Sequence, residues 1–244
     1  MECVCAYCMK GLDQEGAPRC PTCESRHHLD CWRANGGCAV FGCPSGPATV
    51  VTDPGVSTPP GVHAGPPPSS VHQASSGLPA PYSPRERRLD SDYRQLMTIF
   101  AGHPNVSVEP RGAYPPERYG ITLKVPGLRL DEHNRIVQVP LHYVELYLPA
   151  QYPREKPYAT TTYPVFHPNF GAHICIADYW SPAQSLVDVV VQIADMLQYR
   201  QYNIHSPLNA IAANWVAENQ HQVPVGDIDL MPADVVVTIH EEKK

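Results

Sequence analysis

The cysteines are the residues of this chain whose spacing most directly indicates chemistry. Eight of the nine lie among the first 43 residues, where Cys5 and Cys8, and Cys20 and Cys23, form pairs separated by two residues, whereas Cys175 stands alone. A tight turn of that length directs two sulfur atoms at one metal ion, and two tetrahedral zinc ions need eight ligands. The spacing therefore predicts a module with two Zn²⁺ ions over residues 1–43. Its predicted ligands are Cys5, Cys8, Cys20, Cys23, His28, Cys31, Cys38 and Cys43.

Four disulfides are the alternative use of eight clustered cysteines, and they require an oxidising compartment. The N-terminal residues have neither the basic nor the apolar stretch of a signal peptide. No stretch approaches the roughly 18 apolar residues of a membrane helix. A net charge of −6, without a basic stripe beside the cysteines, argues against nucleic acid as a partner. We therefore expect metal sites in a soluble, cytoplasmic protein that binds neither membranes nor nucleic acid.

The surroundings of Cys175 contain further polar groups in a close order. His167-Pro168-Asn169 precedes the cysteine, and Trp180-Ser181-Pro182-Ala183 follows it. A single cysteine in an apolar pocket is usually inert packing. Covalent chemistry needs a reachable thiol and donors directed at the oxyanion that forms when its thioester is attacked. Asn169 supplies an amide donor on a turn fixed by Pro168, which makes Cys175 a candidate nucleophile.

Composition divides the chain into three segments. Over residues 44–83 Pro, Gly, Ser, Ala, Val and His dominate, and Asp53 is the only residue there among Asp, Glu, Lys and Arg. Such a segment cannot bury a core, which predicts a disordered linker. The predicted organisation is a zinc module at 1–43, a linker at 44–83 and a globular domain at 84–244.

Apolar periodicity predicts an α+β globular domain. Ser83 is suited to cap a helix with Pro84 at its first position, and the helical pattern runs to Phe100. Two more helices are expected after Cys175, and Val235–Ile239 is a further strand candidate without a place in the sheet. The helices should pack on or beside an antiparallel meander. Its strands are expected at 106–108, 119–125, 139–148 and 158–162.

Each predicted helix has a stripe of apolar residues that should be buried. In the first helix these residues are Leu89, Tyr93, Leu96, Met97 and Phe100. In the second they are Leu186, Val189, Val190, Ile193 and Leu197. In the third, with Ser206 as its expected cap, they are Leu208, Ile211, Ala212 and Trp215.

The ordered motifs around Cys175 resemble the active-site signature of the ubiquitin-conjugating enzymes, and the likeness extends over about residues 84–220. The resemblance implies the fold of that family, with an N-terminal helix, an antiparallel meander and C-terminal helices. It implies that Cys175 accepts a ubiquitin-like protein as a thioester from an activating enzyme and passes it to an amine of a protein substrate. Asn169 would stabilise the oxyanion or the active-site loop, and His167 would hold the turn by hydrogen bonds. Ser181–Ala183 and the loop 152–157 would form the surface that RING ligases hold.

Two departures from the family pattern concern the active-site loops and the acceptor amine. Ser206 stands where the family often has an acidic residue that helps the amine lose its proton. Asp178 is the nearest alternative carboxylate in the sequence. It could have this catalytic role, or it could be a structural or exposed residue. The segments that join Asn169, Cys175 and Trp180 are shorter than in common members. These departures indicate a divergent, bacterial relative.

The zinc module resembles RING-type fingers, particularly the RING-like domains found in bacteria. The likeness rests on Cys20-Pro21-x-Cys23 and His28-x-x-Cys31-Trp32, although a histidine as the fifth ligand is also typical of PHD fingers. It implies interleaved coordination, with Cys5, Cys8, His28 and Cys31 on one ion and Cys20, Cys23, Cys38 and Cys43 on the other. Cys3 and His27 are expected to be bystanders, and Trp32 to pack in the core.

Two functions remain open from the sequence. The first is a conjugating enzyme whose RING-like module promotes transfer in cis or in trans, with self-association through that module as one arrangement. The alternative is a catalytically weak or inactive scaffold that binds components of the ubiquitin pathway. The basic start of the first helix, Arg85 to Arg88, is either a contact for the activating enzyme or a solvated face.

Overall fold

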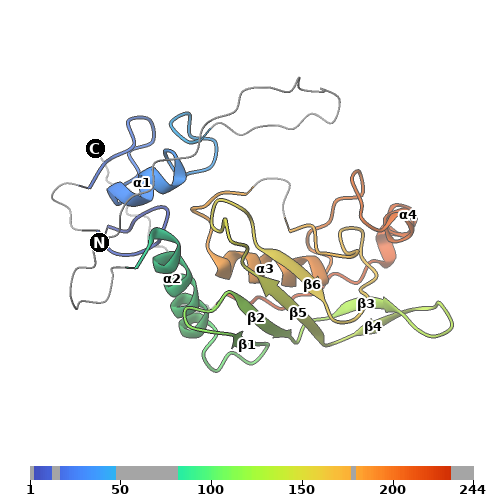
Figure 1. The fold of residues 1–244 in the computed structure, drawn as a ribbon. Helices are drawn as coiled ribbons and strands as arrows, with labels where there is room; N and C mark the ends of the chain where they lie inside the picture. The colour runs from blue at the N-terminus through green and yellow to red at the C-terminus, as the bar shows by residue number, and fades with distance from the viewer. Residues whose placement is uncertain (1–2, 13–16, 48–81, 177–179, 232–244) are drawn as a thin grey trace, which may run out of the picture.

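The computed structural model describes residues 3–12, 17–47, 82–176 and 180–231. Figure 1 shows a small N-terminal unit that carries helix α1 (Leu29–Asn35) and lies against the first helix of a larger unit, α2 (Pro84–Ile99). We call the N-terminal unit, residues 3–47, the finger, and the larger unit from Ser83 onward the main domain. Most of the predicted linker, Asp178 and the strand candidate at Val235–Ile239 lie outside the described residues.

The main domain is built on an antiparallel sheet, as the sequence predicts. Its strand order is β1-β2-β5-β6, and β3 and β4 form a separate hairpin. Burial alternates strictly along β5, which is the pattern of a strand with one face on a core. The bounds are β1 Val106–Arg111, β2 Arg118–Leu123, β3 Gly127–Leu130, β4 Ile136–Val139, β5 His142–Tyr147 and β6 Tyr158–Thr161.

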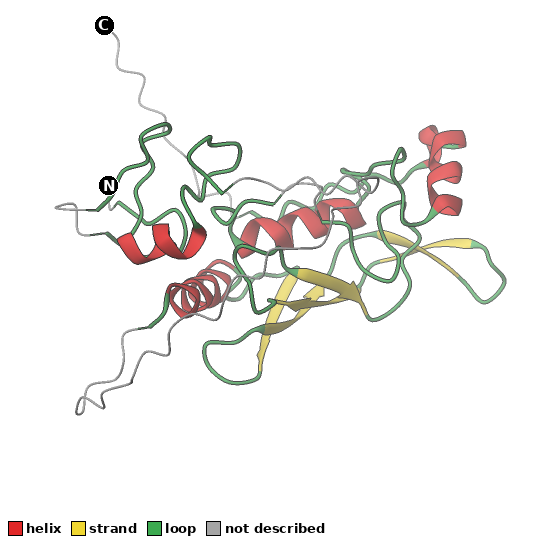
Figure 2. Cartoon of the chain, turned by 45° about the horizontal axis from the view of Figure 1, so that its top comes forward, coloured by secondary structure: helices red, strands yellow, loops and turns green. Residues whose placement is uncertain are grey.

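Two helices cover one face of the sheet, and the main core lies between them and the strands (Figure 2). Helix α2 begins where the sequence predicts, because Ser83 and Glu86 form a reciprocal capping box around Pro84. Helix α3 (Leu186–Leu197) buries all five residues of its predicted stripe. None of the helices in the described ranges is both long and apolar enough to cross a membrane.

The single strand predicted over 139–148 is wrong. Strand β4 ends at Val139 and β5 begins at His142. Pro140 lies between them, and proline has no backbone N–H to donate to a ladder. The hairpin of β3 and β4 was not predicted. It lies at the end of the main domain away from the finger, near helix α4 (Ala210–Glu218) (Figure 1).

The predicted start of the last helix is also wrong. The cap of α4 is Asn209, whose side chain accepts a hydrogen bond from the Ala212 amide at 3.0 Å, and Ser206 lies in the exposed loop before it. The buried face also differs from the predicted stripe, since Ile211 is 73 % exposed while Val216 is fully buried. Leu208, at 41 % exposure, and Met97, at 37 %, are also exposed against the prediction, and Tyr93 and Trp215 are only partly buried.

Candidate active site and metal centres

Cys175 lies at the end of a short loop that is tied to the edge of the sheet. The preceding amide, of Ile174, donates to the Ala159 carbonyl on β6 at 2.8 Å, and the Cys175 amide donates to the Asn169 carbonyl at 3.0 Å. The loop from Asn169 to Cys175 is therefore closed on itself and fixed to the sheet. The cysteine is partly exposed and unpaired, so its thiol is reachable from solvent.

The side chain of Asn169 is clamped by the backbone of Asn203. Its Nδ2 donates to the Asn203 carbonyl at 3.1 Å, and its Oδ1 accepts from the Asn203 amide at 2.7 Å. Because a backbone N–H can only donate, this pair of contacts fixes which end of the Asn169 amide is the oxygen. One of the two Nδ2 hydrogens remains for another acceptor.

His167 holds the turn that carries Asn169. Its Nδ1 accepts from the Asn169 amide at 3.1 Å, and its Nε2 lies 3.3 Å from the Gln201 carbonyl, to which it can only donate. These two contacts define one neutral tautomer. Burial lowers the pKa of His167 to about 4, so the ring is neutral at pH 7.

Cys175 and Asn169 line the same hollow, which has a volume of about 260 Å³. Gln192 of α3 also lines it and donates to the Ile176 carbonyl beside the cysteine. Neither Gln192 nor Asn203 was predicted as a site residue. Gln192 directly follows the apolar run Val189–Val191 of α3, which is a signal the sequence contains. The role of Asn203 is played by its backbone, which leaves no signal in the side-chain pattern.

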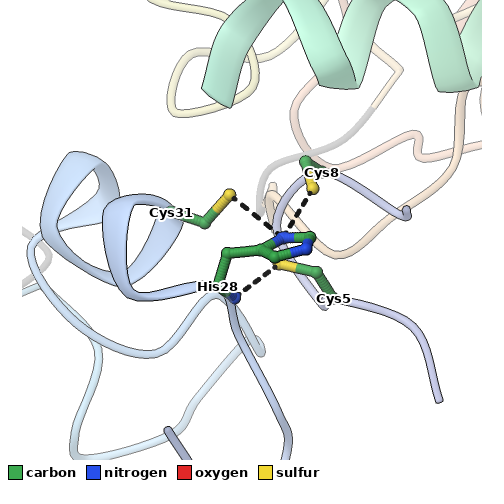
Figure 3. Close-up of side chains that lie close together, drawn as sticks. All are labelled: Cys5, Cys8, His28 and Cys31. Atoms are coloured by element: carbon green, nitrogen blue, oxygen red, sulfur yellow. Dashed lines mark hydrogen bonds between the residues drawn. The ribbon is translucent and has the colours of Figure 1, made fainter. Parts of the chain in front are cut away.

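The eight predicted metal ligands converge in two groups, with the interleaved membership that the resemblance to RING-type fingers implies. The first cluster is Cys5, Cys8, His28 and Cys31, and the second cluster is Cys20, Cys23, Cys38 and Cys43. Figure 3 shows the four side chains of the first cluster turned toward one another. Within each cluster the ligand atoms lie within 4.8 Å of one another. Cys3 and His27 belong to neither cluster.

The donor atoms of both clusters fit a tetrahedral metal ion. Ligands at zinc–sulfur distance from one centre are about 3.8 Å apart. The Cys31 sulfur lies 3.8 Å from His28 Nδ1, and the Cys20 and Cys43 sulfurs are 3.4 Å apart. His27 is instead structural, since its Nε2 accepts from the Ala39 amide at 3.1 Å and its ring meets that of half-buried Trp32 edge to face. Each cluster can therefore hold one metal ion.

The finger contacts the main domain through several polar bonds. Lys10 pairs with Asp90 of α2, and the Ser181 hydroxyl donates to the Ala39 carbonyl at 2.8 Å. Burial would raise the pKa of Asp90, but hydrogen bonds from Lys10, Tyr114 and Arg94 outweigh it and lower the pKa to about 2. Asp90 is therefore charged at neutral pH, and its pair with Lys10 is an ion pair between the two units.

Arg88 is the centre of this interface. The sequence left the basic start of the helix as a contact for the activating enzyme or a solvated face, and the buried Arg88 is neither. Its side chain is fully buried and pairs with Asp92 at 2.8 Å, and Tyr152 bonds to both. It also donates to the Tyr7 carbonyl of the finger and to the Pro182 carbonyl of the loop after Cys175. Burial alone would lower the pKa of Arg88, but the charge of Asp92 raises it. One guanidinium thus joins α2, the finger and the Ser181 loop.

Acid is expected to destabilise the main domain between pH 6.5 and about 4. Burial lowers the pKa of both His167 and His142 from 6.5 to about 4. The unfolded chain takes up each proton near pH 6.5, whereas the folded chain does so only near pH 4. The free energy of unfolding is therefore undiminished above pH 6.5 and falls on acidification, by about 3 kcal/mol per histidine. Chemical denaturation across this pH window measures the fall.

Metal loss also occurs in acid. A comparison of two variants separates its effect on the free energy of unfolding from the effect of histidine protonation. His167→Gln should remove about half of the fall, and His133→Gln, at a side chain that is 66 % exposed, should retain all of it. Equal pH dependence in the two variants would contradict the assignment.

Comparison with known proteins identifies the family of the segment around Cys175. Residues 139–224 match a family model described as ubiquitin-conjugating enzyme. The matched segment runs from the end of β4 through Cys175, α3 and α4. No curated protein matches the chain. Residues 139–224, the segment that carries Cys175, therefore match the ubiquitin-conjugating enzyme family.

Proposed function

We propose that the chain conjugates a ubiquitin-like protein to an amine through a thioester on Cys175. The supporting observation is that the Cys175 thiol and the clamped Asn169 amide line one hollow, inside the segment that matches the family. We expect this chemistry in the cytoplasm, in a bacterial ubiquitin-like system.

Two acyl transfers make up the proposed reaction. In the first, the Cys175 thiolate attacks the thioester that joins the ubiquitin-like protein to an activating enzyme, and the cysteine of that enzyme leaves. In the second, an amine of the protein substrate attacks the new thioester, an amide forms, and the Cys175 thiolate leaves. The free Nδ2 hydrogen of Asn169 can donate to the oxyanion of the second step. The proton of the amine passes to solvent or to a base, for which Asp178 is the sequence candidate.

The finger is proposed to be a RING-like module with a Zn²⁺ ion in each cluster, acting in cis. Zinc suits sites of three or four thiolates, and it would supply the cross-links of a unit with little core of its own. The finger contacts Asp90 of α2 and also Ser181, and Ser181 belongs to the surface that the family resemblance assigns to RING ligases. A tether between the two units keeps the local concentration of the finger high, which favours promotion of transfer in the same chain.

Incubation with the cognate activating enzyme, ATP and ubiquitin-like protein tests the proposal. We expect an adduct between this chain and the ubiquitin-like protein that disappears on treatment with a thiol reductant. A thioester exchanges with thiols, whereas an amide does not. Gel electrophoresis with and without reductant measures it. Absence of any adduct would favour the scaffold function.

The role of the finger in transfer is tested on the same adduct after the activating enzyme is quenched. Ser181→Ala removes the bond to the Ala39 carbonyl, and we expect it to slow discharge to free lysine without slowing adduct formation. Discharge at the unaltered rate would mean that this contact does not promote transfer.

A further inference from the structure

The finger and the main domain meet at a metal ligand. Arg87, in the first turn of α2, donates from Nη2 to the Cys31 sulfur at 3.2 Å and to Asp30 Oδ2 at 2.6 Å. Figure 3 shows α2 passing directly beside the first cluster. We propose that Arg87 couples metal binding at the first cluster to docking of the finger on α2, so that each strengthens the other.

The charge of the first cluster explains why an arginine lies there. Three thiolates and a neutral imidazole around a divalent ion carry a net charge of about −1. A guanidinium beside one of the ligand sulfurs offsets this charge. The Arg87 side chain is only 21 % exposed, so solvent screens the interaction incompletely.

Helix α1 makes the coupling mechanical as well as electrostatic. Asp30 and Cys31 are successive residues of its first turn, and the Asp30 carboxylate accepts from both the Cys31 amide and Arg87. A shift of α1 when the metal leaves therefore moves the ligand and the docking carboxylate together. Conversely, a finger that leaves α2 removes the guanidinium from its metal ligand.

The second cluster provides an internal control. Its Cys38 sulfur lies 3.2 Å from the Ser25 hydroxyl and accepts from the Val40 amide at 3.5 Å. Both partners of the Cys38 sulfur belong to the finger, whereas the Arg87 guanidinium of the main domain reaches Cys31 and Asp30. Loss of Arg87 should therefore weaken metal binding at the first cluster and leave the second cluster unchanged.

Arg87→Ala in the full chain tests the coupling. We expect the metal ion of the first cluster to be lost to a competing chelator about tenfold more readily, the lower range for loss of a residue bonded to a metal ligand. Cadmium-113 NMR of the cadmium-loaded chain separates a site of three sulfurs and one nitrogen from a site of four sulfurs. The matched control is Arg85→Ala, because Arg85 bonds to Glu117 and to the Leu148 and Pro149 carbonyls, all within the main domain. Equal retention in the two variants, or equal loss from both sites of Arg87→Ala, would overturn the proposal.

Asp90→Lys separates coupling from a direct effect of charge. The new lysine would face Lys10 and repel the finger. It would also bring positive charge nearer to an anionic cluster, which by itself favours metal retention. Coupling predicts that the first ion is held less tightly, whereas direct electrostatics predicts that it is held more tightly. Because binding linkage is reciprocal, an ion held more tightly in Asp90→Lys would refute the dependence on docking.

Discussion

Changing Cys175 to alanine is expected to abolish the adduct with the ubiquitin-like protein completely. The proposed mechanism has no other acceptor, since the eight cysteines of the finger are either predicted metal ligands or, in the case of Cys3, distant in sequence from the family segment. Cys175→Ser should instead give an adduct that survives thiol reductants, because an oxygen ester exchanges with thiols far more slowly than a thioester. Gel mobility with and without reductant distinguishes the three chains.

Cys3 provides the matched control for this prediction. It is a partly exposed free cysteine that belongs to neither metal cluster. Cys3→Ala should form the adduct at the rate of the unaltered chain. If the adduct persists in Cys175→Ala, then the nucleophile is another residue and the assignment of Cys175 is wrong.

The parts of the fold that the sequence predicts are those that short-range patterns determine. The capping box at Ser83 and the apolar stripe of α3 are complete within single helices, and both appear as predicted. The local pairs of metal ligands are predicted for a similar reason, since ligand type and spacing specify them, whereas their grouping into two clusters is what the resemblance to RING-type fingers implies. The start of α4 fails because Ser206 and Asn209 are both good caps and only tertiary packing selects between them.

The interface between finger and main domain is the part that the sequence does not predict. Arg88 bonds to the carbonyls of Tyr7 and Pro182, and every residue has a carbonyl, so the contact has no side-chain signature. A run of basic residues is ordinarily a solvated face, yet Arg88 is fully buried. The clamp of Asn203 on Asn169 is hidden for the same reason, because both contacts involve the Asn203 backbone. Contacts made to backbone groups thus leave no pattern in the sequence, and these are the contacts that join the predicted elements.

Asn169→Ala is expected to slow discharge of the Cys175 thioester to an amine by roughly 100- to 1,000-fold, the usual cost of losing one oxyanion donor. Formation of the thioester from the activating enzyme should change much less. The larger effect on discharge than on thioester formation follows if the free Nδ2 hydrogen of Asn169 donates to the oxyanion of the second step. Single-turnover discharge to free lysine, measured on preformed thioester, gives the rate.

A purely structural role for Asn169 predicts a different outcome. Loss of the two bonds to the Asn203 backbone would then loosen the loop that ends at Cys175, so that thioester formation and discharge would fall together. Asn203→Ala is the matched control, because Asn203 holds Asn169 through its backbone and uses its own side chain for the His205 amide. That variant should keep the clamp and discharge at nearly the original rate. If Asn169→Ala slows both steps equally, the amide positions the loop and does not stabilise the oxyanion; if only discharge falls, the donor acts on the reacting atoms.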